Sequence, residues 1–476
     1  MNIISYLINF KTDISAKSGY YKERIYRMQT AQSAYPLHFH TERHAVCSSS
    51  EHAPISKICE GYQFSILFDG KLTNTQNLKS KLAAAGYTFL SDSDAEIALN
   101  CYIHCGENCP EILDGSYSFI IYDAMRRQIF AVSDFFSSRP LFFCVCKDEI
   151  LITSKISGIL SHPSVSAKLS ANSLRELLSF PTDCSGNIFD GIFKIPPVHY
   201  LKIKNGVVSV NEYTLLPNTH LPLDIISKNL SHTDCKNILY SPSSAADLLY
   251  SKLSRESPTI YPLFRDDITS DLLKDGLKET VSACCLPIFS HYDFLLPYTL
   301  KYSENKTFVS AFPYDSAANT KINPQLIQRL LKKPIADTLN LHDYISFSPN
   351  KFSAILPIAS KYGCKIHFPF LAHGIYEQLS ALPYNPELYF QNVSDIAIPT
   401  VHLFRQDCEK IRFLLRRRLL SVISDNSSSI NAFFNPSSIL LMCEGKFNLP
   451  HLTEIALCAY LLKLNIWFEE YRPSII

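Results

Sequence analysis

No run of 18 or more apolar residues occurs in the 476-residue sequence, which excludes a membrane-spanning helix. The first 13 residues lack the basic flank, the full apolar core and the small-residue cleavage site of a signal peptide. Neither sign of charge is in excess, because 45 Lys and Arg stand against 44 Asp and Glu. The resulting net charge of +1 gives no reason to expect a nucleic acid or an anionic membrane as a partner.

Fifteen cysteines, an odd number spread through apolar segments, indicate reduced core thiols in a cytoplasmic protein rather than a disulfide framework. Cys101, Cys105 and Cys109 would share one face of a helix, but their spacing matches no common zinc pattern. Cys144 and Cys146 share one face of a strand, which indicates packing. We therefore predict no metal site.

The length, together with 46% hydrophobic residues, predicts two or three domains with full-sized cores. Residues 1–215 contain short apolar or alternating runs with a few helices between them, which predicts an α+β domain. At the start of the second expected helix Ser93 stands three residues before Glu96, the spacing of a capping box. The expected strands are Gln63–Phe68, Tyr117–Tyr122, Gln128–Val132, Leu141–Val145, Ile150–Thr153 and His199–Ile203, and the expected helices are Asn77–Ala85 and Ala95–Ile103.

Residues 216–235 are polar and contain proline, as a linker does, and residues 236–476 form the second predicted domain. Strands alternate there with helical patterns, which predicts a parallel sheet in an α/β domain with a helical C-terminal end. The basic run at Arg412 and Arg416–Arg418 is a solvated helix face or an anion site. The expected strands are Asn237–Tyr240, Thr259–Leu263, Thr307–Ser310 and Lys365–Phe368, and the expected helices are Asp271–Thr280, Asn323–Leu331, Gln406–Ser424 and Leu452–Glu470.

Residues 236–253 combine an apolar strand, a small-residue turn and a helical pattern, the arrangement in which α/β proteins bind phosphate. The turn Ser241-Pro242-Ser243-Ser244 has no glycine, and Pro242 removes one backbone N–H donor. An ordinary strand-to-helix connection with Ser244 as the N-cap explains the same residues. Both interpretations stay open at this point.

Several stretches, taken in order, resemble the asparagine synthetase family, which joins a class II glutamine amidotransferase domain to an ATP-pyrophosphatase domain. The resemblance is continuous over residues 60–215 and patchy over residues 236–383. It rests on Phe68–Asn74 (FDGKLTN) for the family's FNGEIYN, Ser93–Glu96 (SDAE) for SDTE, Asp134 with Arg139-Pro140-Leu141 for DRLGIKPL, Phe189–Tyr200 for FxGIxKLPPGHY, and Lys365–Pro383 around the PFLDH stretch.

The resemblance implies an N-terminal-nucleophile αββα sandwich followed by a doubly wound, adenine nucleotide alpha-hydrolase-like sheet. Family glutaminases use an N-terminal cysteine as nucleophile, and the second residue here is Asn2. The family's oxyanion-stabilising asparagine is replaced by Asp69, a carboxylate where a donor is needed. Asp69, Gly70 and Asp94 are the candidate residues of a glutamine-like pocket, although Asp94 could equally be a helix N-terminal charge. No catalytic residue is predicted.

The ATP site that the resemblance implies is altered as well. The family's SGGLDS loop falls on residues 241–246, so both glycines are lost and Ala245 replaces the magnesium-binding aspartate. The candidate nucleotide-binding residues that remain are Ser241, Ser243, Ser244 and Asp315. The family's ATP and Mg²⁺ are therefore expected to have been lost.

The first functional hypothesis is a cytoplasmic, asparagine synthetase-like protein that has lost both activities and acts as a binding or regulatory partner. Phe312, Pro313 and Tyr314 replace small or acidic residues, so a protein or peptide could bind in the cleft between the domains, or these residues could simply plug it. The alternative is an ATP-dependent ligase that forms an amide or a lactam, including glutamine-dependent asparagine synthesis.

Overall fold

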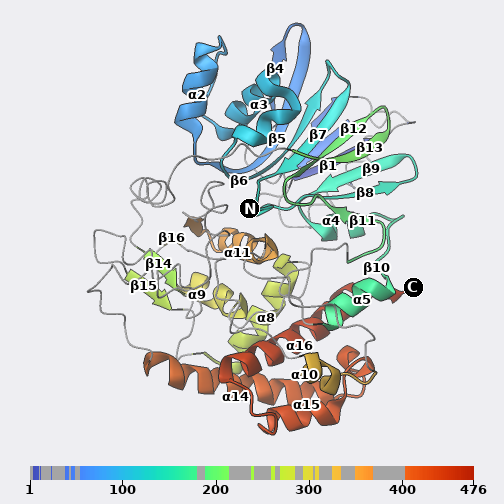
Figure 1. The fold of residues 1–476 in the computed structure, drawn as a ribbon, viewed down its shortest axis with the longest axis vertical. Helices are drawn as coiled ribbons and strands as arrows, with labels where there is room; N and C mark the ends of the chain where they lie inside the picture. The colour runs from blue at the N-terminus through green and yellow to red at the C-terminus, as the bar shows by residue number, and fades with distance from the viewer. Residues whose placement is uncertain are drawn as a thin grey trace. The chain divides into compact units, whose positions relative to one another are not determined.

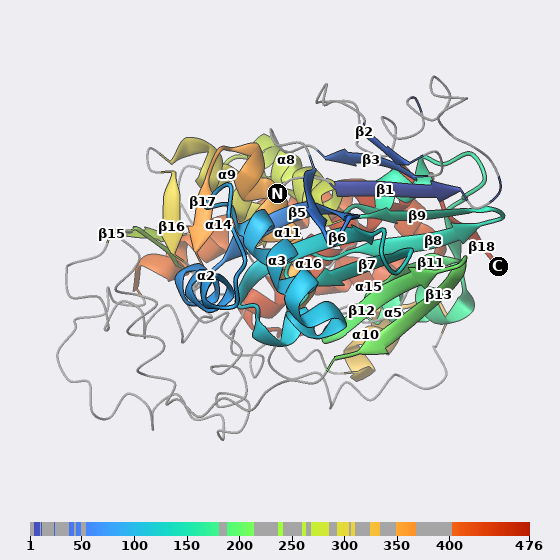
Figure 2. The same ribbon diagram turned by 90° about the horizontal axis from the view of Figure 1, so that it is seen from above.

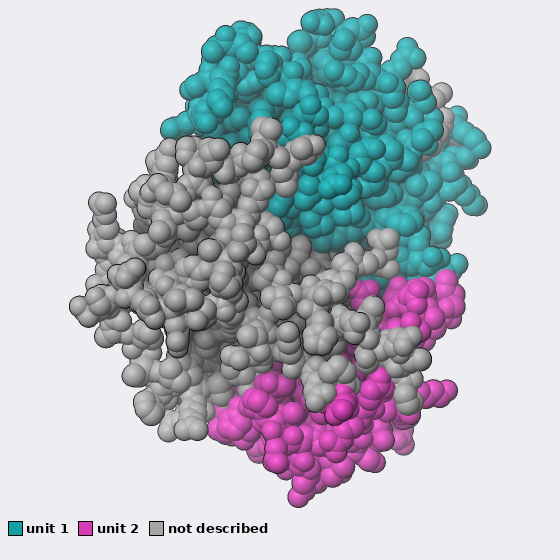
Figure 3. Space-filling view, viewed as in Figure 1, with its two compact units in different colours: residues 1–168, 185–219, 371–373 teal, residues 169–184, 220–370, 374–476 magenta. Residues whose placement is uncertain are grey.

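The structure is a computed structural model, and its two compact units are coloured separately in Figure 3. Unit 1 comprises residues 1–168, 185–219 and 371–373, and unit 2 comprises residues 169–184, 220–370 and 374–476. The division falls inside the expected linker, which lies outside the described residues. The structure describes residues 4–9, 11, 23, 38–41, 44–48, 54–179, 188–213, 237–240, 259–262, 268–284, 293–303, 306–309, 324–333, 349–367 and 402–476.

Unit 1 contains two six-stranded sheets in which all described neighbours are antiparallel (Figures 1 and 2). The order of the first sheet is β11 (Ile192–Lys194), β8 (Phe142–Cys146), β9 (Glu149–Thr153), β1 (Ile4–Asn9), β3 (His44–Ser48) and β2 (His38–Thr41). The order of the second sheet is β13 (Val207–Glu212), β12 (His199–Lys204), β7 (Gln128–Ser133), β6 (Gly115–Asp123), β5 (Tyr62–Leu72) and β4 (Ile55–Cys59).

Two apolar cores hold unit 1 together, one on each face of the second sheet. The alternation along β6 shows how one sequence serves both cores, because Ile120 points between the sheets and Phe119 points to the helical side. The helical layer consists of α2 (Thr75–Ala84), α3 (Asp94–Cys105) and η1 (Gly106–Ile112), while the short α4 (Ile156–Leu160) lies against β8 and β9 of the other sheet. The two central sheets and the helical cover of the αββα expectation are therefore present.

Strand β5 is longer than the sequence pattern predicts, since Asp69 and Gly70 lie inside the strand and not in a turn. Gly70 pairs with Tyr117, and two residues further along Leu72 pairs with Gly115. Both glycines have φ of +140°, and a Cβ at Gly70 would lie 2.3 Å from the Ser116 carbonyl oxygen. The close approach of β5 and β6 at this end therefore requires glycine.

The capping box at the start of α3 is only half formed. The Ser93 hydroxyl accepts a hydrogen bond from the Glu96 N–H at 3.3 Å, as predicted. The Glu96 carboxylate accepts hydrogen bonds from the N–H groups of Leu90 and Ser91, both at 2.7 Å, and not from Ser93. The expected reciprocal bond is wrong because the preceding loop turns back and presents its own donors. Gly106, with φ of +65°, ends α3.

Unit 2 contains a parallel four-stranded sheet in the order β15 (Thr259–Pro262), β14 (Asn237–Tyr240), β16 (Thr307–Val309) and β17 (Lys365–His367). Its described helices are α5 (Ala171–Leu178), α8 (Ser270–Cys284), η2 (Asp293–Leu295), α9 (Leu296–Tyr302), α10 (Pro324–Leu330), α11 (Pro349–Lys361), α14 (His402–Ser424), η4 (Ser429–Ala432), α15 (Pro436–Cys443) and α16 (His451–Tyr471). The two short strands are β10 (Lys168–Leu169) and β18 (Ser474–Ile475). Directly after β18, the Ile476 N–H donates a hydrogen bond to the Leu169 carbonyl at 2.9 Å. Helix α5 is grouped with unit 2, although it lies within the expected domain of residues 1–215.

Helix α16 is the central helix of unit 2 and lies against α8, α14 and η4 (Figure 1). All residues from Glu454 to Asn465 are buried, so this helix is covered on every side over three turns. Glu454 receives hydrogen bonds from Arg416 of α14, and Arg412 bonds to Glu409 at 2.6 Å. Two arginines of the basic run are therefore paired with carboxylates, which favours the helix-face interpretation over an anion site.

A buried ion pair joins α16 to η2. Lys463 is fully buried, and its Nζ donates hydrogen bonds to both carboxylate oxygens of Asp293, at 3.0 and 2.7 Å. Two charges removed from water are tolerated only while each neutralises the other. The pair therefore fixes the position of η2 relative to α16.

Among the helices that the structure describes, none is both long enough and apolar enough to cross a membrane.

We predict that Lys463→Met lowers the free energy of unfolding by roughly 3–5 kcal/mol, because it removes the ammonium group that neutralises the buried Asp293 carboxylate. Urea unfolding followed by the fluorescence of Trp467, the only tryptophan, measures this in the same helix. The control is the double variant Asp293→Leu/Lys463→Met, which should recover most of the loss. A single variant as stable as the parent would contradict the prediction.

Candidate functional site

The predicted pocket residue Asp69 lies near the end of β5, on the face that points between the two sheets. It comes two residues after Leu67, which belongs to the core between the sheets. Asp69 is only 2% exposed, and its Oδ2 accepts a hydrogen bond from Arg139 Nη1 at 2.7 Å. The substituted carboxylate is therefore neutralised by a guanidinium from a segment 70 residues away.

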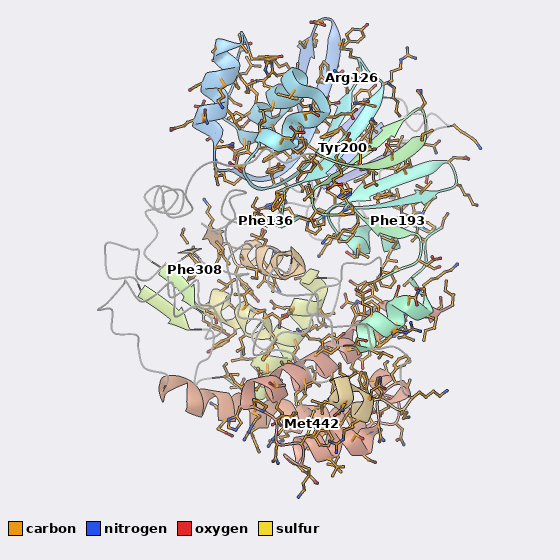
Figure 4. All side chains as sticks on the ribbon, viewed as in Figure 1. Arg126, Phe136, Phe193, Tyr200, Phe308 and Met442 are labelled. Atoms are coloured by element: carbon orange, nitrogen blue, oxygen red, sulfur yellow. The ribbon has the colours of Figure 1, made fainter. Side chains whose placement is uncertain are left out.

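The loop that carries Arg139 is held by the buried carboxylate of Asp134. This carboxylate accepts hydrogen bonds from the N–H groups of Tyr117, Phe136 and Ser138 and from the Ser138 hydroxyl, at 2.7 to 3.3 Å. Burial raises the pKa of Asp134 above its usual value, and these hydrogen bonds act in the opposite direction. Phe136 of this loop is labelled in Figure 4. The loop is thus a rigid support that positions Arg139.

A row of short polar side chains continues from Asp69 across the sheet. Asp69 faces Ser118 of β6, and Ser118 faces Ser133 of β7. All three residues are at most 2% exposed. Ser133 donates a hydrogen bond to the Ser137 hydroxyl at 3.3 Å, whereas the Ser118 hydroxyl has no hydrogen-bond partner in the part of the chain that the structure describes. Ser137 stands where the family motif has glycine, and it keeps a left-handed φ of +50°.

Asp94, the third predicted pocket residue, is the first residue of α3 and is 9% exposed. Its Oδ2 accepts a hydrogen bond from the Leu72 N–H at 3.1 Å and lies 3.0 Å from Lys71 Nζ. These contacts bring Asp94 beside Gly70 at the end of β5. Lys71 stands where the family motif has glutamate, so a cation of the chain itself now meets the carboxylate that the family uses around glutamine.

The loop before Asp94 is organised by Glu96. Burial acts to raise the pKa of Glu96, but hydrogen bonds from the N–H groups of Leu90 and Ser91 and from the Ser91 hydroxyl outweigh it, so the pKa is lowered from 4.5. A carboxyl whose pKa is lowered on folding stabilises the fold above its unfolded pKa, and this contribution is lost as the pH falls. Glu96 is therefore an acid-sensitive support of the Asp94 loop.

The structure thus places Asp69, Gly70 and Asp94 at or beside the end of β5. The predicted nucleotide-binding residues lie outside the described residues; they are Ser241, Ser243, Ser244 and Asp315. The same holds for Asn2, Ala245, Phe312, Pro313, Tyr314 and Ala372. Within the described ranges no group of His, Cys, Asp and Glu could hold a metal ion.

Sequence reasoning missed the two cations and the serines. Part of the signal for the serines was present, because Ser118 lies in the expected strand Tyr117–Tyr122 and Ser116, two residues earlier, shares its face of β6. The partners of the two carboxylates were harder to find. Lys71 is 23 residues from Asp94, and no local pattern joins Arg139 to Asp69.

Comparisons with known proteins agree with this geometry. Residues 29–214 match the family model of the glutamine amidotransferase domain. Glutamine-hydrolysing asparagine synthetase 3 of Bacillus subtilis is 32% identical over 162 residues, covering 34% of this chain and 26% of that protein. Asparagine synthetase 1 of the same organism is 28% identical over 115 residues, covering 24% of this chain and 18% of that protein.

A solved structure, the glutamine phosphoribosylpyrophosphate amidotransferase of B. subtilis, aligns with 53% of this chain and 64% of that chain, at 13% identity and a TM-score of 0.32. A TM-score this low supports no argument. The family match and the site residues define unit 1 as a glutamine amidotransferase-type domain. This part of the chain is similar to glutamine-hydrolysing asparagine synthetases. It spans about a quarter or less of the length of the curated relatives it matches.

We predict that Asp69→Asn destabilises unit 1 by roughly 3 kcal/mol, because it leaves the mostly buried guanidinium of Arg139 without its counter-charge. Hydrogen exchange of β5 and β6 amides, read by mass spectrometry, localises the loss. The double variant Asp69→Asn/Arg139→Gln is the matched control and should restore most of the protection. Unchanged exchange in the single variant would show that the pair contributes nothing.

We also predict that Glu96→Gln lowers the free energy of unfolding at neutral pH by roughly 1–2 kcal/mol, since an uncharged amide accepts these hydrogen bonds less strongly. The difference from the parent should shrink as the pH falls through 4.5 and below, where the parent's own carboxylate becomes protonated. Thermal melts over this pH range measure both effects. A difference that stays constant with pH would refute the role given to the Glu96 charge.

Proposed function

We propose that the chain is an asparagine synthetase-like protein that no longer hydrolyses glutamine and acts as a binding or regulatory partner. The observation that carries the proposal is the internal neutralisation of both pocket carboxylates, Asp69 by Arg139 and Asp94 by Lys71. An ionised carboxylate is only an acceptor and cannot donate to a developing oxyanion. An ammonium group of a ligand would have to displace Lys71 to reach Asp94.

We infer for unit 2 an adenine nucleotide alpha-hydrolase-like fold whose ATP site is lost. In its sheet β14 lies between β15 and β16, so the chain leaves β14 in one direction and returns on its other side. Such a switch point is where open α/β sheets bind ligands. Residues 241–244 directly follow β14, and Asp315 follows β16, but two glycines and a metal carboxylate of the family are replaced there. We therefore propose that ATP and Mg²⁺ no longer bind.

We place the protein in the cytoplasm. Among the cysteines whose side chains are described, all nine are free thiols, as in a reducing compartment, and six of the nine are buried. The charge balance of the whole chain, +1, supports neither a nucleic acid nor an anionic membrane as the partner. A protein or peptide partner agrees best with these properties.

We predict that the purified full chain releases ammonia from L-glutamine at least about 100-fold more slowly than an intact glutamine-hydrolysing asparagine synthetase, the positive control. The physical reason is the loss of a neutral donor at Asp69 and of a free carboxylate at Asp94. A coupled ammonia assay measures the rate. Turnover comparable with the control would overturn the proposed function.

A further inference from the structure

Both carboxylates at the end of β5 are already occupied by cations of the chain. Asp69 Oδ2 lies 2.7 Å from Arg139 Nη1, and Asp94 Oδ2 lies 3.0 Å from Lys71 Nζ. The four charges of these two pairs sum to zero. A ligand that brings an ammonium group would meet these two cations, and both of these carboxylates are already paired with them.

The donors at the same place are not fully used. The Ser118 hydroxyl is completely buried and has no hydrogen-bond partner within the described ranges. Arg139 donates through Nε to Ser116 Oγ at 3.2 Å and through Nη1 to Asp69, so its hydrogen bonds within those ranges leave Nη2 available. A guanidinium has five N–H donors and no acceptor. Buried polar groups almost always have a partner, so a missing partner must be explained.

Arg139 and Ser118 have neighbours in common on one face of the second sheet. Asp69, which Arg139 contacts, directly faces Ser118 across β5 and β6. Ser116, its other contact, is two residues before Ser118 and therefore on the same face of β6. The exposed fraction of the side chain falls from 74% for Lys71 to 13% for Arg139, and Ser118 is fully buried. Burial therefore increases from Lys71 through Arg139 to Ser118.

These observations define the chemistry of the missing group. The Ser118 hydroxyl and Arg139 Nη2 are donors that remain available within the described ranges. Two such donors suit the two oxygens of a carboxylate, because charge-assisted hydrogen bonds to a carboxylate are the strongest that they can make. We propose that Arg139 and Ser118 bind a small carboxylate that carries no ammonium group. The proposal rests on the proposed function, since it requires that Lys71 and Arg139 have taken over the pocket carboxylates.

The test compares L-glutamine with glutaramate, which has the same carboxylate and terminal amide but no ammonium group. Isothermal titration calorimetry on the full chain should show glutaramate binding at least about tenfold more tightly than L-glutamine. Equal or tighter binding of L-glutamine, or no binding of glutaramate, would overturn the inference. The ammonia assay is independent, so either result leaves the proposed loss of glutaminase activity separately testable.

The matched variant is Ser118→Ala. It should weaken glutaramate binding by about tenfold, because one hydrogen bond to a charged group is lost, while the melting temperature of the free protein stays the same or rises. Removal of a buried hydroxyl that bonds only to ordered water would give the opposite pattern, a lower melting temperature and an unchanged affinity. That pattern would contradict the proposed role of Ser118.

Discussion

The carboxylate of Asp69 lies between two stacked sheets, where a charge without a counter-charge would cost several kcal/mol. Arg139 supplies the counter-charge, and the position of Arg139 depends in turn on the loop that Asp134 holds through four hydrogen bond donors. The end of the second sheet is therefore built around one ion pair. Its geometry also determines which donors, those of Arg139 and Ser118, are left to meet a ligand.

The second charge pair follows the same logic closer to the surface. Gly70 and Gly115 let β5 and β6 approach closely, and this brings the Leu72 N–H and Lys71 to Asp94. Lys71 is 74% exposed in its side chain, so its pairing is screened by solvent and is weaker than that of Asp69. Each of the two candidate pocket carboxylates is therefore neutralised by a cation of the chain itself.

Much of unit 1 could be predicted from the sequence, because its strands alternate between two cores and α3 begins at a recognisable cap. The end of β5 could not, since Asp69-Gly70-Lys71 has the composition of a turn and only its pairing with residues 116–118 of β6 keeps it in the strand. The charge pairs were also beyond local patterns, because their partners are brought together by the fold. Motif spacing located Asp69 and Asp94 but could not show that each was already paired.

The most direct test of the account is a high-resolution crystal structure of the full chain grown with saturating L-glutamine. The account predicts that Arg139 remains bonded to Asp69, that Lys71 remains bonded to Asp94, and that no glutamine ammonium group occupies the end of β5. A structure in which Lys71 is displaced and Asp94 receives the ammonium group of glutamine would contradict it.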